Sequence, residues 1–463
     1  MGAKPVLATA SFISVSQNET APAWYTSISI LSVDILALST IYWAAVIGRR
    51  FITPGHVHFY FEVFPGVLFF VLAFAIQGLY PGVLLHPAEE IRRVFHCVSI
   101  VFLVFVCTTF LWHNAESYSR SIVIIMWALG TPAVLVGRTL ARHVLSRYNW
   151  WGVPAVVFGS GMSAQRVINT LTNRILGVRV TGVVSRDLFH LPRGSTAHYA
   201  ILAEPPQSGT ALHELIQDKC KGYSHVLLVP NLHGICSLGV SAIDIGGEIG
   251  FEVPQRLFHK SAGMLKRAMD LLLTLPALIA FSPLFLFISM AIKLTSSGPV
   301  FYGHVRQGRD GKAFEALKFR TMFRSGESIL LEHFLKHPEE LTAWQHDQKL
   351  KSDPRVTPVG RWLRRYSLDE LPQLYNVLLG QMSLVGPRPI VSGEIQKYGR
   401  GYDLYSRVRP GITGLWQVSG RNNTTYPERV AFDEYYVRNW SIWLDTYILV
   451  RTVRAVFSAE GAY

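Results

Sequence analysis

Cysteine and charge are both scarce in this sequence, and each shortage narrows the class of protein. The cysteines number 4 among 463 residues, namely Cys97, Cys107, Cys220 and Cys236, and they show no paired spacing. This spacing indicates neither a disulfide framework nor a zinc site, so we expect a reducing compartment. Charged residues make up 16% of the chain and hydrophobic residues 49%, which is too apolar for an ordinary soluble protein of this length. We therefore expect membrane segments.

Acidic residues are the scarcer of the two charge types, which leaves a net charge of +13, most of it in residues 260–463. A basic balance favours anionic partners such as nucleic acid, nucleotides, lipid phosphates or an anionic membrane face. The aromatic residues gather in apolar runs and no nucleic-acid-binding module occurs, so we expect no nucleic-acid partner.

Four apolar runs follow a polar N-terminal tail at 1–26, which lacks the features of a cleavable signal peptide. The runs cover 27–48, 58–80, 94–112 and 121–146. Each is near or above the ~20 residues that a helix needs to cross a bilayer. We predict a four-helix transmembrane bundle within 27–148.

The basic residues of the connecting segments favour a cytoplasmic N-terminus. That orientation gives the inner side Lys4, Arg92, Arg93, Arg138, Arg142 and Arg147, and the outer side Arg49, Arg50 and Arg120. Asp34 lies inside the first run, where an ionisable group is costly and can mark a functional pathway. Because we expect no second acid within the membrane itself, we favour a residue that faces the bundle or the membrane interface near the cytoplasmic end.

Residues 149–257 predict a small Rossmann-like parallel α/β domain. Strands are expected at 154–158, 177–184, 198–203 and 224–230, alternating with helical stretches. The motif Gly159-x-Gly161-x-x-Ala164 follows the first strand and opens a helix, the context of a dinucleotide fingerprint, with Asp187 near the end of the second strand. The domain is smaller than a complete dinucleotide fold, so we favour a regulatory or dimerising role over cofactor binding.

A further apolar run at about 266–294 is interrupted by Ser282 and Pro283. Proline removes a helix hydrogen bond and disfavours helical geometry before it, which predicts a sharp bend. Lys266, Arg267 and Lys293 flank the run, so both ends could face anionic headgroups on one side of the membrane. We favour this re-entrant helix over a straight span with a tolerated kink.

Asp369 and Glu370 stand where a helix is expected to begin, within Ser367-Leu-Asp-Glu-Leu-Pro372. Ser367 and Glu370 have the spacing of a capping box, whereas an N-cap at Asp369 suits Pro372 better. Either register places two carboxylates beside the positive end of a helix, where phosphate groups bind and where carboxylates can act as nucleophile and Mg²⁺ ligand. The alternative is an acidic cap on a surface helix.

The surrounding sequence is rich in arginines fixed beside glycine or proline, which suggests rigid loops that present guanidinium groups to phosphate oxygens. The segments are Arg306-Gln-Gly-Arg309, Lys318-Phe-Arg-Thr-Met322, Gly386-Pro-Arg-Pro389, Arg409-Pro-Gly-Ile-Thr-Gly-Leu-Trp-Gln417 and Ser419-Gly-Arg421. His333 and His337 also have helical spacing, but no third ligand accompanies them, so we interpret them as an exposed helix face.

Together these motifs resemble the bacterial sugar transferase family, the polyprenol-phosphate sugar-1-phosphate transferases, across about 262–463. The motifs KRAMD, KFRTM, SLDELPQLYNVL, MSLVGPRP and RPGITGLWQVSGR occur in the family's order. The preceding helices and α/β domain extend the resemblance to the long form of the family. The segments YGHVRQGR, PRPIVS and the terminal GAY are most similar to its galactose-transferring subgroup.

The resemblance implies a mainly α catalytic domain at 258–463, with Asp369 as the nucleophile and Glu370 as the Mg²⁺-associated carboxylate. Lys318, Arg320, Arg388 and Arg421 are then candidate phosphate contacts, and Asp433 and Asp445 match acidic family positions. The implied reaction transfers a sugar-1-phosphate, here galactose-1-phosphate, from a UDP-sugar to undecaprenyl phosphate through an aspartyl-phosphosugar intermediate. It releases UMP and begins polysaccharide assembly.

The resemblance further implies a multi-pass protein of the bacterial inner membrane in contact with its lipids, a cytoplasmic catalytic domain and a possible homodimer. UDP-glucose is the alternative donor. A nucleotide-sensing membrane scaffold or regulator is the alternative class, and the intact acidic pair with its arginines argues against it.

Overall fold

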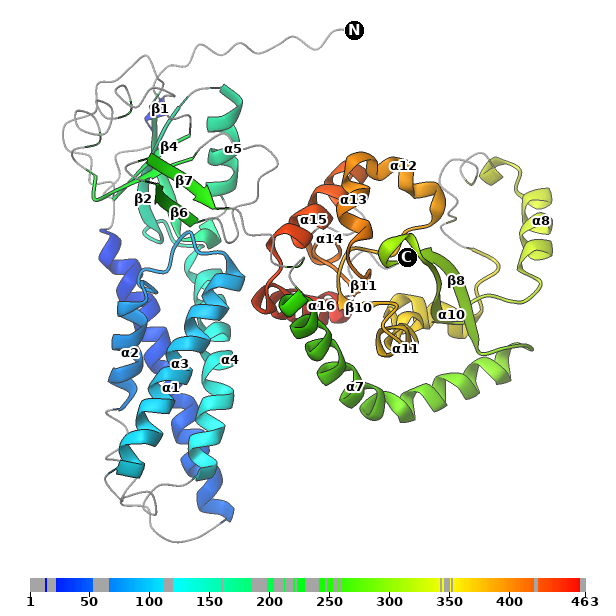
Figure 1. Cartoon of the computed structure of the whole chain (residues 1–463), viewed down its shortest axis with the longest axis horizontal. Helices are drawn as coiled ribbons and strands as arrows, with labels where there is room; N and C mark the ends of the chain where they lie inside the picture. Colours follow the sequence, from blue (N-terminus) through cyan, green and yellow to red (C-terminus); the bar gives the residue numbers. More distant parts are fainter. Residues whose placement is uncertain are drawn as a thin grey trace. The chain divides into compact units, whose positions relative to one another are not determined.

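The computed structural model divides the chain into two compact units, 1–233 and 234–463. The structure describes residues 13–14, 22–52, 66–111, 120–159, 161–172, 174–184, 198–203, 212, 220, 223–229, 241–245, 248–252, 257, 260–341, 344, 350, 353–419 and 424–458. Figure 1 shows the elements along the chain.

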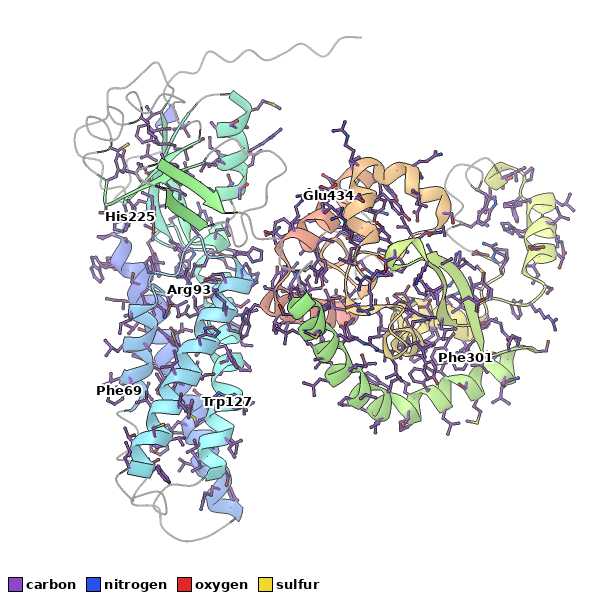
Figure 2. The ribbon with its side chains drawn as sticks, viewed as in Figure 1. Phe69, Arg93, Trp127, His225, Phe301 and Glu434 are labelled. Atoms are coloured by element: carbon purple, nitrogen blue, oxygen red, sulfur yellow. The ribbon has the colours of Figure 1, made fainter. Side chains whose placement is uncertain are left out.

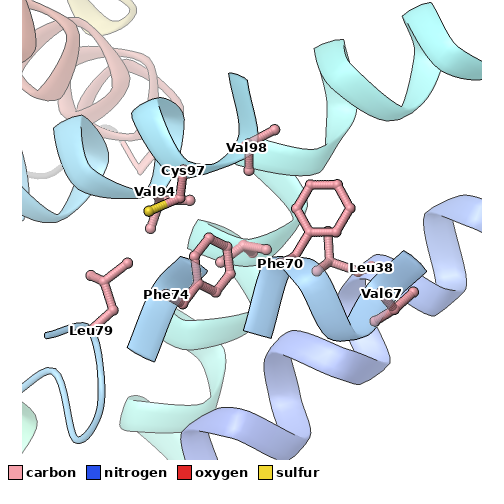
Figure 3. Packing of buried hydrophobic residues seen from close by; sticks show 9 residues of the cluster. Leu38, Val67, Phe70, Phe74, Leu79, Val94, Cys97 and Val98 are labelled. Atoms are coloured by element: carbon pink, nitrogen blue, oxygen red, sulfur yellow. The ribbon is translucent and has the colours of Figure 1, made fainter. Parts of the chain in front are cut away.

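Four helices form a bundle in the first unit. They are α1 (Ala23–Ile52), α2 (Val67–Ile76), α3 (Pro87–Leu111) and α4 (Arg120–Leu145). Their shared core contains Leu38, Phe70, Phe74, Val94 and Val98, and Figure 3 shows these side chains packed between the helices. Phe69 and Trp127 instead lie on the outside of the bundle, 66% and 44% exposed (Figure 2). Apolar groups outside as well as inside suit a bundle surrounded by lipid.

Four described helices are long and apolar enough to cross a membrane, but they are not the four that the sequence predicted. The segments are Ala23–Arg49, Pro87–Leu111, Ser121–Leu145 and Ser261–Thr295. The predicted second crossing at 58–80 contains α2, which has only ten residues. The chain leaves helical geometry at Gly78, where φ is 67°, so the C-terminal end of that prediction is wrong. Residues 53–65, at its start, lie outside the described part.

Asp34 faces the inside of the bundle and forms a buried ion pair. Nε and Nη2 of Arg138 donate to its two carboxylate oxygens at 2.9 and 2.6 Å, and the Tyr80 hydroxyl donates at 2.8 Å. Arg138 also donates to Glu90, which Arg142 contacts in turn. The bundle-facing prediction for Asp34 is confirmed. The expectation of no second acid is wrong, because Glu90 in α3 belongs to the same network.

A parallel sheet occupies the rest of the first unit. Its strands are β2 (Val153–Phe158), β3 (Val178–Val184), β4 (Tyr199–Leu202) and β5 (His225–Leu228), at the four predicted places. The order is β1-β3-β2-β4-β5, where β1 (Ile13–Ser14) adds an antiparallel edge from the N-terminal tail, which the sequence did not predict. Helix α5 (Gly161–Leu171) follows β2. Gly159 and Gly161 both have positive φ at this turn, as a tight strand-to-helix connection requires.

The second unit is mainly helical, as predicted. It contains two antiparallel hairpins, β6 (Ser241–Ile245) with β7 (Glu248–Glu252) and β8 (Phe301–Gln307) with β9 (Ala313–Phe319), and one parallel pair, β10 (Ser383–Val385) with β11 (Gly411–Thr413). Its longer helices are α7 (Lys260–Thr295), α8 (Gly326–Lys336), α10 (Pro358–Arg365), α15 (Tyr426–Asn439) and α16 (Ile442–Ser458). The shorter ones are α11 (Gln373–Leu378), α12 (Ile395–Tyr398), α13 (Tyr402–Ser406) and α14 (Leu415–Ser419).

Helix α7 runs without interruption through Ser282 and Pro283. Figure 1 shows it as one continuous helix that curves along its length, so the predicted bend does not break the helix at these residues. The Ser282 hydroxyl donates to the carbonyl of Ile279 at 2.7 Å. Such side-chain hydrogen bonds satisfy backbone groups that a proline leaves without a partner, which lets an apolar helix tolerate the residue.

Candidate active site

The acidic pair lies in a short turn that leads into α11. Residues Leu368–Glu370 form a 3-10 turn (η8), and Ser367 before it is left-handed, with φ of 54° and no capping hydrogen bond from its side chain. The predicted capping box is wrong, because an N-cap residue needs extended backbone. The alternative cap at Asp369 is also wrong, because Pro372 occupies that position. With only six residues, α11 supplies little dipole, so the charge around the pair comes from side chains.

Lys318 contacts both carboxylates. Its Nζ lies 2.7 Å from Oε1 of Glu370 and 3.8 Å from Oδ2 of Asp369. The Asp369 side chain is 13% exposed and that of Glu370 is 29% exposed. Three of the residues predicted from the sequence are thus brought together, at a place that remains open to a substrate.

The two carboxyl groups have opposite pKa shifts. Burial raises the pKa of Asp369 to about 6; the neighbouring Glu370 also raises it, and Lys318 opposes both. Burial acts against ionisation of Glu370 as well, but Lys318, Arg388 and Arg306 outweigh it and lower the pKa. Asp369 is therefore the more basic carboxylate, and Glu370 stays ionised. Pairs of carboxyl groups separated in this way can take different chemical roles.

Asn376 in α11 fixes the acidic turn to the strand that carries Lys318. Its side-chain oxygen accepts the N–H of Leu317 at 2.9 Å, and its amide nitrogen donates to the carbonyl of Glu315 at 2.7 Å. Asn376 is buried, and a buried amide with two main-chain partners holds one geometry. Lys318, next along β9, therefore reaches the acidic pair.

Arg388 and Arg306 form a second cationic group of the site. Arg388 follows β10, and its guanidinium carbon lies 5.5 Å from the centre of the Trp416 ring. Arg306 on β8 donates to the carbonyl of Pro389 at 3.2 Å. The loop that carries Arg388 after β10 needs glycine at Gly386, because a Cβ there would lie 2.7 Å from the carbonyl oxygen of Arg409. Both arginines are close enough to affect the pKa of Glu370.

Of the other predicted phosphate contacts, Arg320 has a partner outside the acidic pair. Nη2 of Arg320 donates to the carbonyl and the hydroxyl of Ser296, both at 2.8 Å, where the chain leaves α7. No ion pair joins Arg320 to Asp369 or Glu370 in the part of the chain that the structure describes. Arg421 lies outside the described residues.

Asp433 and Asp445 are buried and have structural partners. Asp433 accepts a hydrogen bond from the Tyr398 hydroxyl at 2.8 Å, and burial raises its pKa to about 7. Asp445 accepts from the Tyr436 hydroxyl and the Trp440 indole, and it pairs with Lys266 at 2.8 Å. Asp445 therefore belongs to the attachment of α7.

The KRAMD motif attaches α7 to the second unit. Lys266 bridges Asp270 and Asp445, and Asp270 accepts hydrogen bonds from the hydroxyl of Ser383 and the N–H of Leu384. Arg267 donates to two carbonyls at the end of α11, those of Val377 at 2.5 Å and Leu378 at 2.9 Å. The start of α7 is thereby fixed to α11, which follows the acidic turn, and to β10 beyond it.

Magnesium fits the chemistry of the acidic pair. No group of three or more His, Cys, Asp or Glu side chains suited to a metal ion occurs among the described residues. Mg²⁺ is nevertheless commonly held by one or two carboxylates, with waters and substrate phosphates as its other ligands. Asp369 and Glu370 supply two adjacent carboxylates of this kind, so they could hold the ion only together with a substrate.

Comparison with known proteins identifies relatives of both halves of the chain. The family model for bacterial sugar transferases matches residues 261–459, and one for a CoA-binding domain matches 75–207. The chain is 34% identical to an undecaprenyl-phosphate galactose phosphotransferase of Salmonella typhimurium, over 81% of this chain and 82% of that protein. It is 35% identical to a UDP-glucose:undecaprenyl-phosphate glucose-1-phosphate transferase of Escherichia coli, over 66% and 68%. The exopolysaccharide production protein ExoY of Sinorhizobium fredii is 47% identical over 46% of this chain and 95% of its own length.

A basic, mainly helical unit with an apolar helix and an acidic pair beside a lysine suits an enzyme that acts on phosphate-bearing substrates at a membrane. The chain belongs to the bacterial sugar transferase family, in its long form.

Sequence reasoning placed Arg306 among the arginines expected to face phosphate, but it gave no position in this site to Arg306, Asn376 or Asp270. A signal was present for Arg306. Tyr302 pairs with Lys318 across the hairpin, and alternation along β8 puts residue 306 on that same face. Asn376 and Asp270 carry no comparable local signal, because their partners lie far away in the sequence.

Proposed function

We propose that the chain transfers a sugar-1-phosphate from a UDP-sugar to undecaprenyl phosphate and releases UMP. The acidic pair carries this proposal. In a member of this family, one carboxyl with a pKa raised to about 6 stands beside a second one that Lys318 keeps ionised. One carboxylate is thus suited to nucleophilic attack and the other to cation binding.

Asp369 acts as the nucleophile. Its carboxylate oxygen attacks the sugar-linked phosphorus, the phosphoanhydride bond breaks, and UMP leaves with the bonding electron pair. The sugar-phosphoryl group remains on Asp369 as an acyl phosphate. A phosphate oxygen of undecaprenyl phosphate then attacks the same phosphorus and breaks the acyl phosphate bond. The Asp369 carboxylate is regenerated, and the lipid carries a diphosphate-linked sugar.

Lys318 reduces the repulsion that this chemistry must overcome. Its ammonium lies beside both carboxylates, where an anionic nucleophile would meet an anionic phosphoryl group. When bound, Mg²⁺ would be held by Glu370 with the donor diphosphate and would offset the charge that develops on UMP.

The position of α7 supports a re-entrant membrane helix. Its first half is attached through Lys266 and Arg267, and its second half packs through Ile288 and Ile292 against Phe319 and Leu363 of the same unit. Between these attachments the large side chains are exposed, Leu272 at 73%, Ile279 at 75% and Leu286 at 74%. A helix attached at both ends to one folded unit with an apolar middle suits entry and exit on one membrane face, here the cytoplasmic one.

Labelling in sealed inverted vesicles tests this topology. Single cysteines replace Ser261 and Thr295, both exposed at opposite ends of α7, in a protein whose natural cysteines have been removed. We expect an impermeant thiol reagent to reach both positions from the cytoplasmic side. Labelling of the two positions from opposite sides would contradict the re-entrant helix and leave a straight span.

We propose galactose as the sugar. Two relatives named for undecaprenyl-phosphate galactose or UDP-galactose transfer each match 81% of this chain, whereas two named for UDP-glucose transfer match 60% and 66%. The two sugars differ in the orientation of one hydroxyl, and a site that hydrogen-bonds this hydroxyl discriminates strongly.

The decisive experiment supplies radiolabelled UDP-galactose and UDP-glucose at equal concentration, with Mg²⁺ and undecaprenyl phosphate. We expect galactose-1-phosphate in the lipid fraction and no transfer by Asp369→Asn, whose amide cannot form the acyl phosphate. Preferential transfer of glucose-1-phosphate would refute the galactose assignment alone. Normal transfer by Asp369→Asn would refute the nucleophile.

A further inference from the structure

Two arginines from different elements lie against one buried indole. The guanidinium carbon of Arg388 lies 5.5 Å from the ring centre of Trp416, and that of Arg429 in α15 lies 4.8 Å from it. Neither arginine forms an ion pair with a carboxylate in the part of the chain that the structure describes. Two cations thus share one aromatic support, and neither is in direct contact with a described acid.

A third arginine joins this group from the hairpin. Nη1 of Arg306 donates to the carbonyl of Pro389, the residue after Arg388. Burial and the nearby Arg388 lower the pKa of Arg306, and Glu394 is the acid that opposes this most. Glu394 accepts the N–H of Val391 and makes no described ion pair with Arg306. Arg306 also shares the β8–β9 face with Lys318 and so faces the acidic pair.

Three guanidinium groups placed close together repel one another, which costs electrostatic free energy unless an anion binds between them. Lys318 differs, because Asp369 and Glu370 already neutralise it. Each arginine has five N–H donors in a planar fork, and the contacts described here use few of them. Stacking on an indole ring or donating a hydrogen bond to a carbonyl fixes the position of a guanidinium group but does not neutralise its charge.

We infer that Arg306 and Arg429 complete, with Arg388, an anion-binding surface beside the acidic pair that takes the phosphate groups of the substrates. The ligand is a phosphate ester or diphosphate, and it can come from the nucleotide sugar or from the polyprenol phosphate. These two substrate names rest on the proposed function, whereas the surface itself rests on the three arginines.

The test uses the full-length protein in lipid nanodiscs and the variants Arg306→Met and Arg429→Met. Arg407→Met is the matched control, because Arg407 is an exposed arginine of the same unit that is paired with Asp403. UDP binding is measured by calorimetry, and KM and kcat are measured for the nucleotide sugar and for undecaprenyl phosphate. Loss of one charge-assisted contact predicts a ~10-fold or greater weakening of UDP binding.

We expect the KM for the nucleotide sugar to rise by a similar factor, with a smaller change in kcat. Arg306→Lys should restore part of the UDP affinity, and Arg407→Met should behave like the unmodified protein. If UDP binding is unchanged and only the KM for undecaprenyl phosphate rises, the surface takes the lipid phosphate. If both KM values and UDP binding are unchanged, or if lost UDP binding always accompanies loss of the folded state in thermal unfolding, the inference is overturned. If UDP binding depends on Arg306 and Arg429 but no UDP-sugar is a donor, the surface stands and the proposed function fails.

Discussion

Lys318→Met should move the acid limb of the pH–rate profile to higher pH. Lys318 lowers the pKa of Asp369, which burial has raised to about 6, so its removal raises that pKa further. Asp369 must be ionised to attack phosphorus, and the rate therefore falls as pH drops through its pKa. The profile of kcat/KM reports this value for the free enzyme.

The separation of 3.8 Å between the two charged groups sets the size of the shift. Unit charges ~4 Å apart interact by ~4 kcal/mol at an effective dielectric constant of ~20 and by ~1 kcal/mol in bulk water. Lys318 is 26% exposed and Asp369 13% exposed, so the interaction lies between these limits. At ~1.4 kcal/mol per pH unit, we expect a shift of ~1–2 units.

The assay measures kcat/KM for the nucleotide sugar between pH 5 and pH 9 in nanodiscs. Lys318→Arg, which keeps the charge, and Lys312→Met, which removes an exposed charge from the same hairpin, serve as controls. In both control variants the acid limb of the profile should lie at the same pH as in the unmodified protein. A Lys318→Met profile whose acid limb stays in place or moves to lower pH would show that Lys318 does not stabilise the ionised Asp369.

Three further outcomes are expected. The folded-state pKa of Asp369 is raised to about 6, so its ionisation lowers the stability of the folded protein as pH rises from about 4 to about 6. Asp369→Asn should therefore unfold at a higher temperature than the unmodified protein at pH 7.5. This difference in unfolding temperature should shrink at pH 4. Protein limited to residues 234–463 should keep transfer activity in detergent, since a relative covered over 95% of its length matches only 46% of this chain; inactive but folded protein would contradict this. Arg138→Ala leaves the Asp34 carboxylate buried without its cation and should cost ~3–5 kcal/mol, seen as a lower unfolding temperature, whereas exposed Arg147→Ala should not.

Local sequence patterns were sufficient for the parts of the fold that depend on short-range rules. The strands at 153–158 and 178–184 are apolar and rich in β-branched residues, and they form where these residues stand. The long apolar runs likewise form helices. The same rules failed at 58–80, because hydropathy alone does not show where a helix stops; Gly78 ends α2 there.

Contacts between distant residues could not be predicted in this way. Asp34 and Arg138 are separated by 104 residues, and only the folded bundle brings them together. Nor does any spacing rule connect Asn376 with the main chain of β9, about 60 residues earlier, although this contact aligns Lys318 with the acidic pair. At Ser282 and Pro283 the local rules did not show that the helix continues, with the Ser282 hydroxyl bonded to the carbonyl of Ile279.

The acidic turn is where the local rule and the function conflict most directly. A capping box at Ser367 would have been the favourable local choice, but it would have bound the Glu370 side chain to the main chain of residue 367. The left-handed Ser367 instead leaves Glu370 available to Lys318 and places Asp369 beside the same ammonium. A non-glycine residue at positive φ has an energetic cost, which the attachment of α11 to β9 through Asn376 can offset. Sequence rules that seek the lowest local energy fail at such a turn because both carboxylates instead contact Lys318, the arrangement that the proposed reaction uses.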